Sequence, residues 1–316
     1  MRFVPAEQVH RLLDYAALVD TLAEAHRGEK PVVDRSELHH EQAAEGGRQS
    51  FLNLPAWIPG RAMGIKMITV MPANEKVWNL PTVHAVYQLF NGTTGEPLAA
   101  IDGSALTLRK TAADSALGAR LLARDNVETM LLLGAGAMAP HLIEAHCVVR
   151  PSIRTVVIWN RTYEKAQRLA AEASIAGVSV TATDDIETAV RQADLISSAT
   201  SATVPIVKGD WLKPGCHLDL VGSFTPDMRE TDDEVVRRST LFVDSRWFAV
   251  HQPGDLAQPI ADRLISEDDI AADLFELCSG AHDGRAHDDE ITFFKNGGGA
   301  HLDLFTALHI LDSIAA

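Results

Sequence analysis

The sequence predicts an α/β protein with a doubly wound parallel sheet and a second, α+β domain. Strand-like and helix-like segments alternate from residue 128 onward, which is typical of a parallel sheet with crossover helices. A glycine-rich turn follows the first of these strands, whereas residues 51–101 carry several strand patterns in succession. The length of 316 residues suits two domains. We expect residues 122–297 to form the doubly wound domain, and residues 1–121 with 298–316 to form the second.

The second domain is expected to combine helices with a small sheet. Residues 5–27 space their apolar positions like one amphipathic helix. The sequence NGTTGE at 91–96 separates two strand patterns and predicts a hairpin. An alanine-rich helix is expected over 107–123, with Thr107 as a favourable N-cap residue. Strand patterns in this part of the chain lie at 51–58, 63–71, 82–90 and 97–101.

The doubly wound domain is expected to alternate strands and helices. Strands are predicted at 128–134, 155–160, 178–183, 194–200, 215–222 and 240–245. Helices are predicted at 137–149, 162–174, 185–193 and 233–239. The last stretch, 291–314, ends in another helix rich in alanine and leucine.

Composition narrows the class of partner. The net charge of −15 argues against nucleic acid, which binds to a basic face. No run reaches the ~18 apolar residues of a membrane span, and the N-terminus lacks a signal-peptide core, so a cytoplasmic protein is expected. The three cysteines are far apart and predict neither a disulfide framework nor a zinc site. The histidines lack metal-ligand spacing, and no metal is expected.

The glycine-rich turn predicts a dinucleotide site. The run LLLGAGAMA places Gly134, Gly136 and Ala139 as GxGxxA between a strand and a helix. Glycine at these positions permits a tight turn and lets the backbone approach a pyrophosphate, which the helix amides can bind. This context predicts a Rossmann domain with a nicotinamide cofactor.

The residues after the next strand favour NADPH over NADH. An Asp or Glu there would grip the ribose 2′-hydroxyl, but the strand ends in Asn160, Arg161 and Thr162. A guanidinium can bind a 2′-phosphate bidentately, and no carboxylate repels it. Binding of NADH stays possible. Thr200 and Ser201, after a later strand, are expected near the nicotinamide ribose.

Cations on the second domain predict an anion site. Arg109 and Lys110 fall in the first turn of the predicted helix, where the helix dipole disfavours them unless an anion binds between them and the helix amides. Lys66 interrupts an apolar strand pattern, which is costly unless the side chain is paired or lies at a pocket wall. The alternative is that one of Arg109 and Lys110 is a surface cation and the other forms a salt bridge. The sequence pattern around Arg48 does not indicate a role for it.

Taken together, these segments resemble the ornithine cyclodeaminase/μ-crystallin family over essentially the whole chain. The matching pieces, in order, are R-x-S at 48–50, GIKMITV, PTVHAVYQLFNGTTGEPLA, LTLRKTAADSALGA, GAGAMA, VIWNRT, GDL and ITFFKNGGGAHLD. The resemblance implies a Rossmann domain and a separate domain that binds substrate and forms a homodimer.

The resemblance also implies roles for particular residues. Arg48, Lys66 and one cation of the 109–110 pair would hold a substrate carboxylate. The family usually has arginine where this chain has Lys110, so either member could be the clamp, and we favour Arg109 with Lys110 close by. Thr82 and Phe224 complete the expected substrate site. The cofactor set is Thr111, Gly134, Gly136, Ala137, Met138, Asn160, Arg161, Thr162, Thr200, Ser201, Ser223, Lys295 and Asn296.

The loop at 222–233, GSFTPDMRETDD, indicates which branch of the family applies. Cyclodeaminases carry an aspartate two residues after the strand glycine, and here that position is Phe224. The loop is similar to that of ketimine reductases. Deamination of ornithine needs a base, whereas hydride delivery to an imine needs chiefly positioning and a proton, for which Lys66 is the candidate. The leading hypothesis is an NADPH-dependent oxidoreductase that converts Δ1-pyrroline-2-carboxylate or Δ1-piperideine-2-carboxylate to L-proline or L-pipecolate.

Three alternatives remain at this point. Ornithine cyclodeamination would need Asp227 to take the missing role, against a stiff backbone at Pro226. An alanine or opine dehydrogenase would use the same hydride chemistry on acyclic imines. A non-catalytic NADPH-binding protein of the crystallin type is the third. Asp219 is expected to be a hydrogen-bonded strand residue, and Asp303 to serve local structure.

Overall fold

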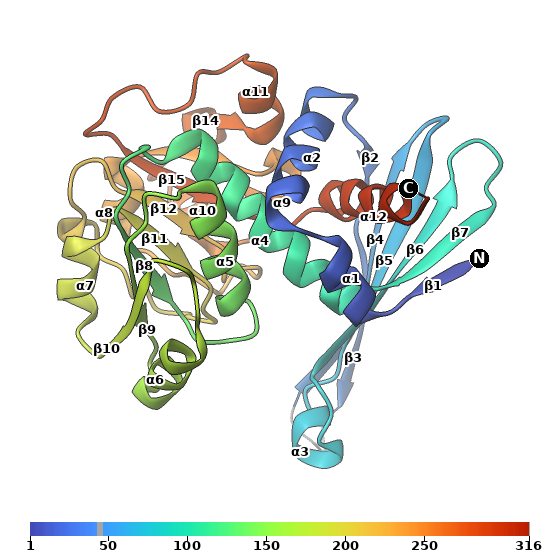
Figure 1. Ribbon diagram of the computed structural model, residues 1–316, viewed down its shortest axis with the longest axis horizontal. Coiled ribbons are helices and arrows are strands. Elements are labelled where there is room, and N and C mark those ends of the chain that lie inside the picture. Colours follow the sequence, from blue (N-terminus) through green and yellow to red (C-terminus); the bar gives the residue numbers. More distant parts are fainter. Residues whose placement is uncertain (43–46, 316) are drawn as a thin grey trace. The chain divides into compact units, whose positions relative to one another are not determined.

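The computed structural model describes residues 1–42 and 47–315, which form two compact units (Figure 1). Unit 1 comprises Met1–Thr111 and Gly299–Ala316, and unit 2 comprises Ala112–Gly298. The expected domain boundary after residue 121 coincides with a helix end, whereas the observed division falls inside that helix. No helix among the described residues is both long and apolar enough to cross a membrane.

Unit 1 is built on a mixed sheet with the strand order β1-β7-β6-β5-β4-β2, and β3 pairs with β4. The pair β1–β7 is parallel, and the other pairs are antiparallel. The four strands expected between residues 51 and 101 are all present, and β1, β2 and β3 are additional. The strands are β1 (Arg2–Val4), β2 (Val32–Val33), β3 (Ser36–Gln42), β4 (Gly47–Ile58), β5 (Ala62–Val70), β6 (Val83–Asn91) and β7 (Pro97–Asp102).

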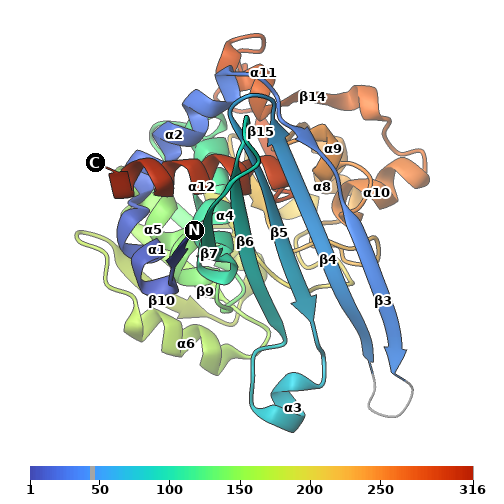
Figure 2. The same cartoon turned by 90° about the vertical axis from the view of Figure 1, so that its right-hand side faces the viewer.

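Helices cover one face of this sheet. Figure 2 shows α12 (Ala300–Ala315) lying across the strands, where it packs on β4, β5 and β6 and against α2 (Tyr15–Arg27). Strand positions alternate accordingly: Leu54, Ala56 and Ile58 of β4 are buried under the helices. Trp57 of the same strand points to the opposite face and is 45% exposed. The sheet therefore has one covered face and one face rich in exposed apolar side chains.

The expectation for the N-terminal helix of unit 1 needs correction. The single helix expected over 5–27 is two helices, α1 (Ala6–Leu12) and α2, because the backbone leaves the helical region at Leu13 and Asp14 then caps α2 by accepting from the amide of Ala17. A short helix, α3 (Asn74–Trp78), joins β5 to β6. The predicted hairpin at 91–96 is present between β6 and β7.

The helix expected over 107–123 is α4 (Gly103–Leu122), which begins four residues earlier. The side chain of Asp102 accepts from the amide of Ala105 and starts the helix there. A Cβ at Gly103 would lie 2.7 Å from the backbone of Ala85, so only glycine fits. Arg109 and Lys110 therefore lie beyond the first turn, and the predicted conflict with the helix dipole does not exist.

Unit 2 contains the predicted doubly wound sheet. Its strand order is β10-β9-β8-β11-β12-β15-β13-β14, and all of its pairs are parallel. The strands are β8 (Thr129–Leu133), β9 (Thr155–Trp159), β10 (Ser179–Thr183), β11 (Leu195–Ser198), β12 (His217–Leu220), β13 (Ser239–Val243), β14 (Ile270–Asp273) and β15 (Ile291–Lys295). The helices are α5 (Ala139–Val149), α6 (Tyr163–Glu172), α7 (Ile186–Gln192), α8 (Asp233–Arg238), α9 (Arg246–Ala249), α10 (Gly254–Ala261) and α11 (Leu274–Ser279), with 3₁₀ turns at Gly209–Trp211 and Glu267–Asp269.

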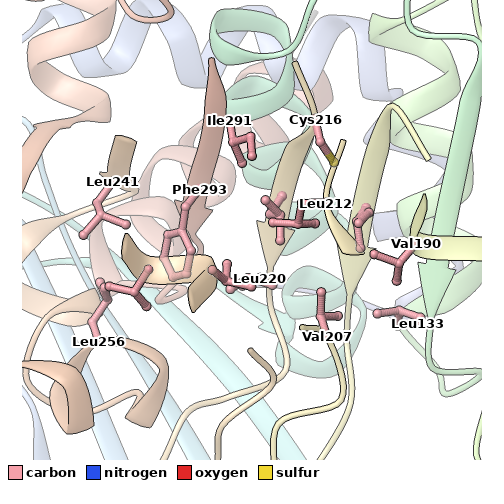
Figure 3. Close-up of a cluster of buried hydrophobic side chains, with 14 of the residues drawn as sticks. Leu133, Val190, Val207, Leu212, Cys216, Leu220, Leu241, Leu256, Ile291 and Phe293 are labelled. Atoms are coloured by element: carbon pink, nitrogen blue, oxygen red, sulfur yellow. The ribbon is translucent and has the colours of Figure 1, made fainter. Parts of the chain in front are cut away.

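The core of unit 2 lies along this sheet. Figure 3 shows the apolar side chains of Leu133, Val190, Val207 and Leu220, which belong to one buried cluster. The winding direction reverses between β8 and β11, which are neighbours in the sheet. In doubly wound sheets, ligands bind at such a reversal, beyond the carboxyl ends of the strands. The fold therefore predicts a ligand site at the loops after Leu133 and Ser198.

Candidate active site

The glycine-rich turn joins β8 to α5 and has the backbone that its sequence predicts. Gly134 adopts a φ of +103°, and a Cβ there would lie 2.6 Å from the carbonyl oxygen of Ala199. At Gly136, by contrast, a Cβ would point into open space. Gly134 is thus required by the fold of unit 2, whereas the missing side chain of Gly136 keeps space free for a ligand.

A cavity of about 530 Å³ opens at this turn. The loop after β11, including Thr200 and Ser201, forms its opposite wall. Arg161 and Thr162 also line the cavity, and Arg161 is exposed. The side chain of Asn160 accepts from the amide of Ala135 at 3.2 Å and donates to the carbonyl of Thr162 at 2.8 Å. Seven residues predicted from the sequence thus line one cavity: Gly134, Gly136, Asn160, Arg161, Thr162, Thr200 and Ser201.

This cavity fits a dinucleotide on its own geometry. Its walls come from the loops after β8, β9 and β11, of which the first and the last lie at the reversal point of the sheet. The space beside Gly136 lets a phosphate approach the backbone. Ala137 and Met138 lie between Gly136 and the start of α5, and Met138 is its N-cap residue. Cofactor contacts expected at Ala137 and Met138 stay predictions.

A buried carboxylate behind the cavity wall was missed by the sequence reasoning. Glu230 is fully buried, and its oxygens accept four hydrogen bonds, from Ser198, from the amide and hydroxyl of Thr200 and from the amide of Gly222. Burial, followed by the neighbouring carboxylate of Asp255, raises the pKa of Glu230 to about 7. Its position in an acid-rich loop gave no signal, because the partners are brought together only by the fold.

Four other residues predicted for the cofactor are buried, and three of them, Lys295, Asn296 and Ser223, have defined hydrogen-bond partners. The ammonium of Lys295 is buried, donates to the carbonyl of Leu220 at 2.9 Å and lies 3.4 Å from Asp255. Asn296 donates to the hydroxyl of Ser115 at 2.9 Å. Ser223 and Thr111 are both buried, and the hydroxyl of Ser223 donates to the carbonyl of Met228 at 2.7 Å. Their roles toward a cofactor also stay predictions.

Unit 1 contains a buried cluster of opposite charges. The ammonium of Lys66, on β5, lies 3.0 Å and 2.8 Å from the two carboxylate oxygens of Asp303, on α12. Lys110, on α4, lies 3.6 Å from the same carboxylate and donates to the carbonyl of Gly299 at 3.5 Å. All three side chains are at most 3% exposed. Among these three groups one carboxylate faces two ammonium groups, so the trio carries more positive than negative charge, which favours an anion.

Lys66 is poised to exchange a proton near neutral pH. Desolvation lowers its pKa from 10.5 to about 8, although the attraction of Asp303 opposes this shift, and the charge of Lys110 lowers the pKa further. Tyr87 on β6 is the cross-strand neighbour of Lys66. Its hydroxyl is also buried near Asp303, and desolvation is the main reason why the pKa of Tyr87 is raised well above 10. Gly64 makes room for that hydroxyl, since a Cβ there would lie 2.0 Å from it.

The structure separates Arg109 from Lys110. Arg109 donates to the ring of His10 at 3.2 Å and lies 4.6 Å from the centre of the Tyr15 ring. Neighbouring residues on a helix point about 100° apart, so the two side chains take different directions. This arrangement places Lys110, rather than the favoured Arg109, beside Lys66. Arg48 is exposed on β4, and Thr82 is half-buried just before β6, so their expected contacts with substrate stay predictions.

The loop after β12 agrees with its sequence reading in part. Phe224 is 63% exposed, and its expected packing beside a substrate stays a prediction. The carboxylate of Asp227 accepts from the hydroxyl of Thr225 at 2.6 Å. Asp219 is a hydrogen-bonded strand residue, as predicted, and its carboxylate contacts His146 and Ser197.

Asp303 belongs to the buried charge cluster, which the sequence did not predict. It was predicted to serve local structure, yet it is the carboxylate that both buried lysines face. Its distance of 237 residues from Lys66 along the chain explains why no motif joined them. A lysine inside an apolar strand was the available signal that a buried acid had to exist somewhere in the chain.

The chain is similar to known proteins over most or all of its length. Residues 3–316 match the model of the ornithine cyclodeaminase/mu-crystallin family. A Delta(1)-pyrroline-2-carboxylate reductase from Paracoccus denitrificans is 42% identical over 266 residues, which cover 83% of this chain and 82% of that protein. The Thermococcus litoralis Delta(1)-pyrroline-2-carboxylate reductase, solved in complex with NADH and L-proline, is 29% identical with a TM-score of 0.91 over 100% of this chain and 98% of that one. An archaeal alanine dehydrogenase dimer with bound NAD is 26% identical, with a TM-score of 0.90 over 100% and 96%.

Proposed function

This chain belongs to the ornithine cyclodeaminase/mu-crystallin family, and we propose that it is an NAD(P)H-dependent reductase of cyclic ketimine carboxylates. Its substrates are Δ1-pyrroline-2-carboxylate or Δ1-piperideine-2-carboxylate, and its products are L-proline or L-pipecolate. The observation that carries the proposal is the buried Lys66–Asp303–Lys110 cluster, which offers a net positive charge and a titratable ammonium to a small carboxylic acid. Relatives named as reductases of the same imine, and the proline in one of them, support the choice of substrate.

The proposed reaction requires little acid–base catalysis by the protein. When bound, the reduced nicotinamide supplies the hydride that reduces the imine carbon. The protein has to hold the substrate carboxylate, present C2, and let the ring nitrogen gain one proton. Lys66 and Lys110 hold the carboxylate. Lys66, with a pKa of about 8, carries a proton at neutral pH that it can release to the nitrogen and regain from solvent.

The loop after β12 argues against deamination of ornithine. Phe224 stands where cyclodeaminases carry an aspartate, and a phenyl ring can neither accept nor release a proton. Asp227 is held by the hydroxyl of Thr225, in a loop stiffened by Pro226. In the proposed reaction, Phe224 packs beside the apolar ring of the substrate.

The decisive assay follows NAD(P)H absorbance with several substrates. Consumption of cofactor is expected with the cyclic ketimines and little with pyruvate plus ammonia. Lys66→Met should lower kcat/KM by about 100-fold or more, because it removes the titratable ammonium and leaves Asp303 with one partner. Lys76→Met, on the exposed face of α3, is the matched control and should leave kcat/KM unchanged. Ammonia and proline formed from ornithine without net use of cofactor would refute the proposal.

For the cofactor we propose a preference for NADPH. The support is Arg161, which lines the cavity and is exposed beside Asn160 and Thr162, where a ribose 2′-phosphate can reach its guanidinium. Arg161→Ala should raise the KM for NADPH about tenfold and leave that for NADH nearly unchanged. An enzyme that prefers NADH, with no response to this substitution, would contradict the assignment.

We also propose that the protein is a homodimer formed through unit 1. The face of the sheet opposite α12 carries exposed or half-buried apolar side chains, among them Phe51, Trp57 and Ile65. A largely apolar groove of about 510 Å³ runs past Trp57, Ile65 and Phe90. Contiguous apolar surface of this kind suits a protein interface, and a related alanine dehydrogenase is a dimer.

Light scattering after size exclusion tests the dimer. The wild-type protein should have twice the chain mass of 34.2 kDa. Trp57→Glu should yield monomer, whereas Trp247→Glu, which changes an equally exposed tryptophan in unit 2, should not. A monomeric wild type would refute this proposal.

A further inference from the structure

One wall of the cofactor cavity, the loop after β11, is held from behind by the side chain of Glu230. Glu230 lies in the segment between β12 and α8 and is fully buried. Its Oε1 atom accepts from the hydroxyl of Ser198 at 2.6 Å and from the amide and the hydroxyl of Thr200, both at 2.8 Å. Its Oε2 atom accepts from the amide of Gly222 at 2.8 Å. The carboxylate therefore joins the loop after β11 to the loop after β12.

These two loops approach each other closely enough that no side chain fits between them. A Cβ on Gly222 would lie 2.1 Å from the carbonyl oxygen of Thr200 and 2.5 Å from Oε1 of Glu230. Thr200 in turn lines the cavity opposite the glycine-rich turn. The position of Thr200 in the cavity wall is thus determined by its three contacts with this carboxylate and this glycine.

Glu230 is itself held by charged groups from two other elements. Its amide donates to the carboxylate of Asp255, on α10, at 2.7 Å. Lys295, at the end of β15, lies 3.4 Å from Asp255 and donates to the carbonyl of Leu220. Two buried acids thus share one buried ammonium, which is a costly arrangement if its only purpose is stability.

We propose that Glu230 is a positioning residue for the cofactor, which fixes the Thr200 wall of the cavity in the shape that binds the nicotinamide half. The inference rests on the proposed function, because it assumes a nicotinamide cofactor in this cavity. Only an ionised carboxylate accepts all four hydrogen bonds. A neutral acid or an amide would turn a donor toward one of the four donors and loosen one of the two loops.

Ionisation of Glu230 should therefore be linked to cofactor affinity. The charged groups that face it are Asp255 and Lys295. Burial and Asp255 raise the pKa of Glu230 to about 7, so its protonation falls inside the range in which the protein can be assayed. Affinity for the cofactor should be highest above this pH and should fall below it.

The test is a fluorescence titration of the full-length protein with NADH between pH 6 and 8.5. NADH is used because it lacks the 2′-phosphate, whose own titration would obscure the result. For the wild type, Kd should rise about tenfold from pH 8 to pH 6. For Glu230→Gln, Kd should be about tenfold above wild type at pH 8 and nearly constant with pH, so that the two proteins converge at pH 6.

Asp219→Asn provides a matched control, since Asp219 is an equally buried acid of the same sheet with contacts to Ser197 and His146. It should keep the wild-type Kd and its pH dependence. If Glu230→Gln does not fold, Thr200→Val replaces it. This variant loses one hydrogen bond to Glu230 and should weaken NADH binding about threefold.

The inference is overturned if Glu230→Gln, or Thr200→Val in its place, binds NADH within twofold of wild type at pH 8. That result would leave the reductase proposal standing, provided that imines are still reduced. A wild-type protein that binds NADH but reduces no imine would refute the proposed function. The NADH titrations would still test the role of Glu230, because they measure cofactor affinity alone. A wild type that binds neither NADH nor NADPH would refute both.

Discussion

Replacing Asp303 by asparagine gives the sharpest test of the buried charge cluster in unit 1. The substitution keeps the size of the side chain and one oxygen acceptor but removes the negative charge. Lys66 lies at 2.8 and 3.0 Å from this carboxylate and Lys110 at 3.6 Å, with all three side chains nearly or fully buried. Two ammonium groups would then lie close together without the carboxylate that now faces both of them.

The magnitude follows from the distances. With an effective dielectric constant of ~20, a charge pair at about 3 Å interacts by roughly 5 kcal/mol, which corresponds to about 3–4 pKa units. The pKa of Lys66, already lowered to about 8, should fall well below neutrality once this attraction is lost. Breaking a buried pair while one partner remains typically costs about 3–5 kcal/mol of folding free energy.

Two measurements check this expectation. Urea unfolding at pH 7 should show a free energy of unfolding about 3–5 kcal/mol below wild type. The pH dependence of kcat/KM should show at least a 100-fold loss at pH 7, because a neutral Lys66 neither attracts the carboxylate nor supplies the proton. Asp312→Asn makes the same change on the exposed side of α12 and should alter neither quantity. An Asp303→Asn protein within about 1 kcal/mol of wild-type stability, with an unchanged pH profile, would refute the reasoning.

Three further outcomes follow from the structure of unit 2. Gly134→Ala should lose about 1–3 kcal/mol of stability, because φ is +103° and the carbonyl of Ala199 obstructs a Cβ. Gly136→Ala should be as stable as wild type, because a Cβ there meets open space, but it should bind NADH at least about tenfold more weakly. Chemical denaturation and cofactor titration distinguish the two variants, and equal stability of both would contradict the geometry. The raised pKa of Glu230 favours its neutral form in the folded state, so wild-type stability should decline relative to Glu230→Gln as pH rises from about 4.5 to 7, by roughly 3 kcal/mol. A constant difference across that range would show that the pKa is not raised. Arg150→Ala, which removes hydrogen bonds to three carbonyls at the end of α4, should cost about 2–3 kcal/mol in urea unfolding without a change in Kd for NADH.

The sequence predicted the glycine-rich turn and the residues around it because they are close together along the chain. A turn with a positive φ at Gly134, a following helix and a strand that ends in Asn160 are all encoded within about thirty residues of chain. The alternating pattern also predicted the parallel sheet, since each strand buried on both faces reads as an apolar run. Local patterns thus determined the fold class and one wall of the cavity.

The charged networks could be decided only by the tertiary structure. Sequence patterns gave Lys66 no partner and gave Glu230 no role, and they placed Arg109 and Lys110 one turn too close to a helix end. Asp303 meets Lys66 across 237 residues, and Glu230 meets Ser198 across 32. A buried charge is tolerated only beside its counter-charge or its donors, and which groups meet depends on how strands and helices pack rather than on any local preference of the chain.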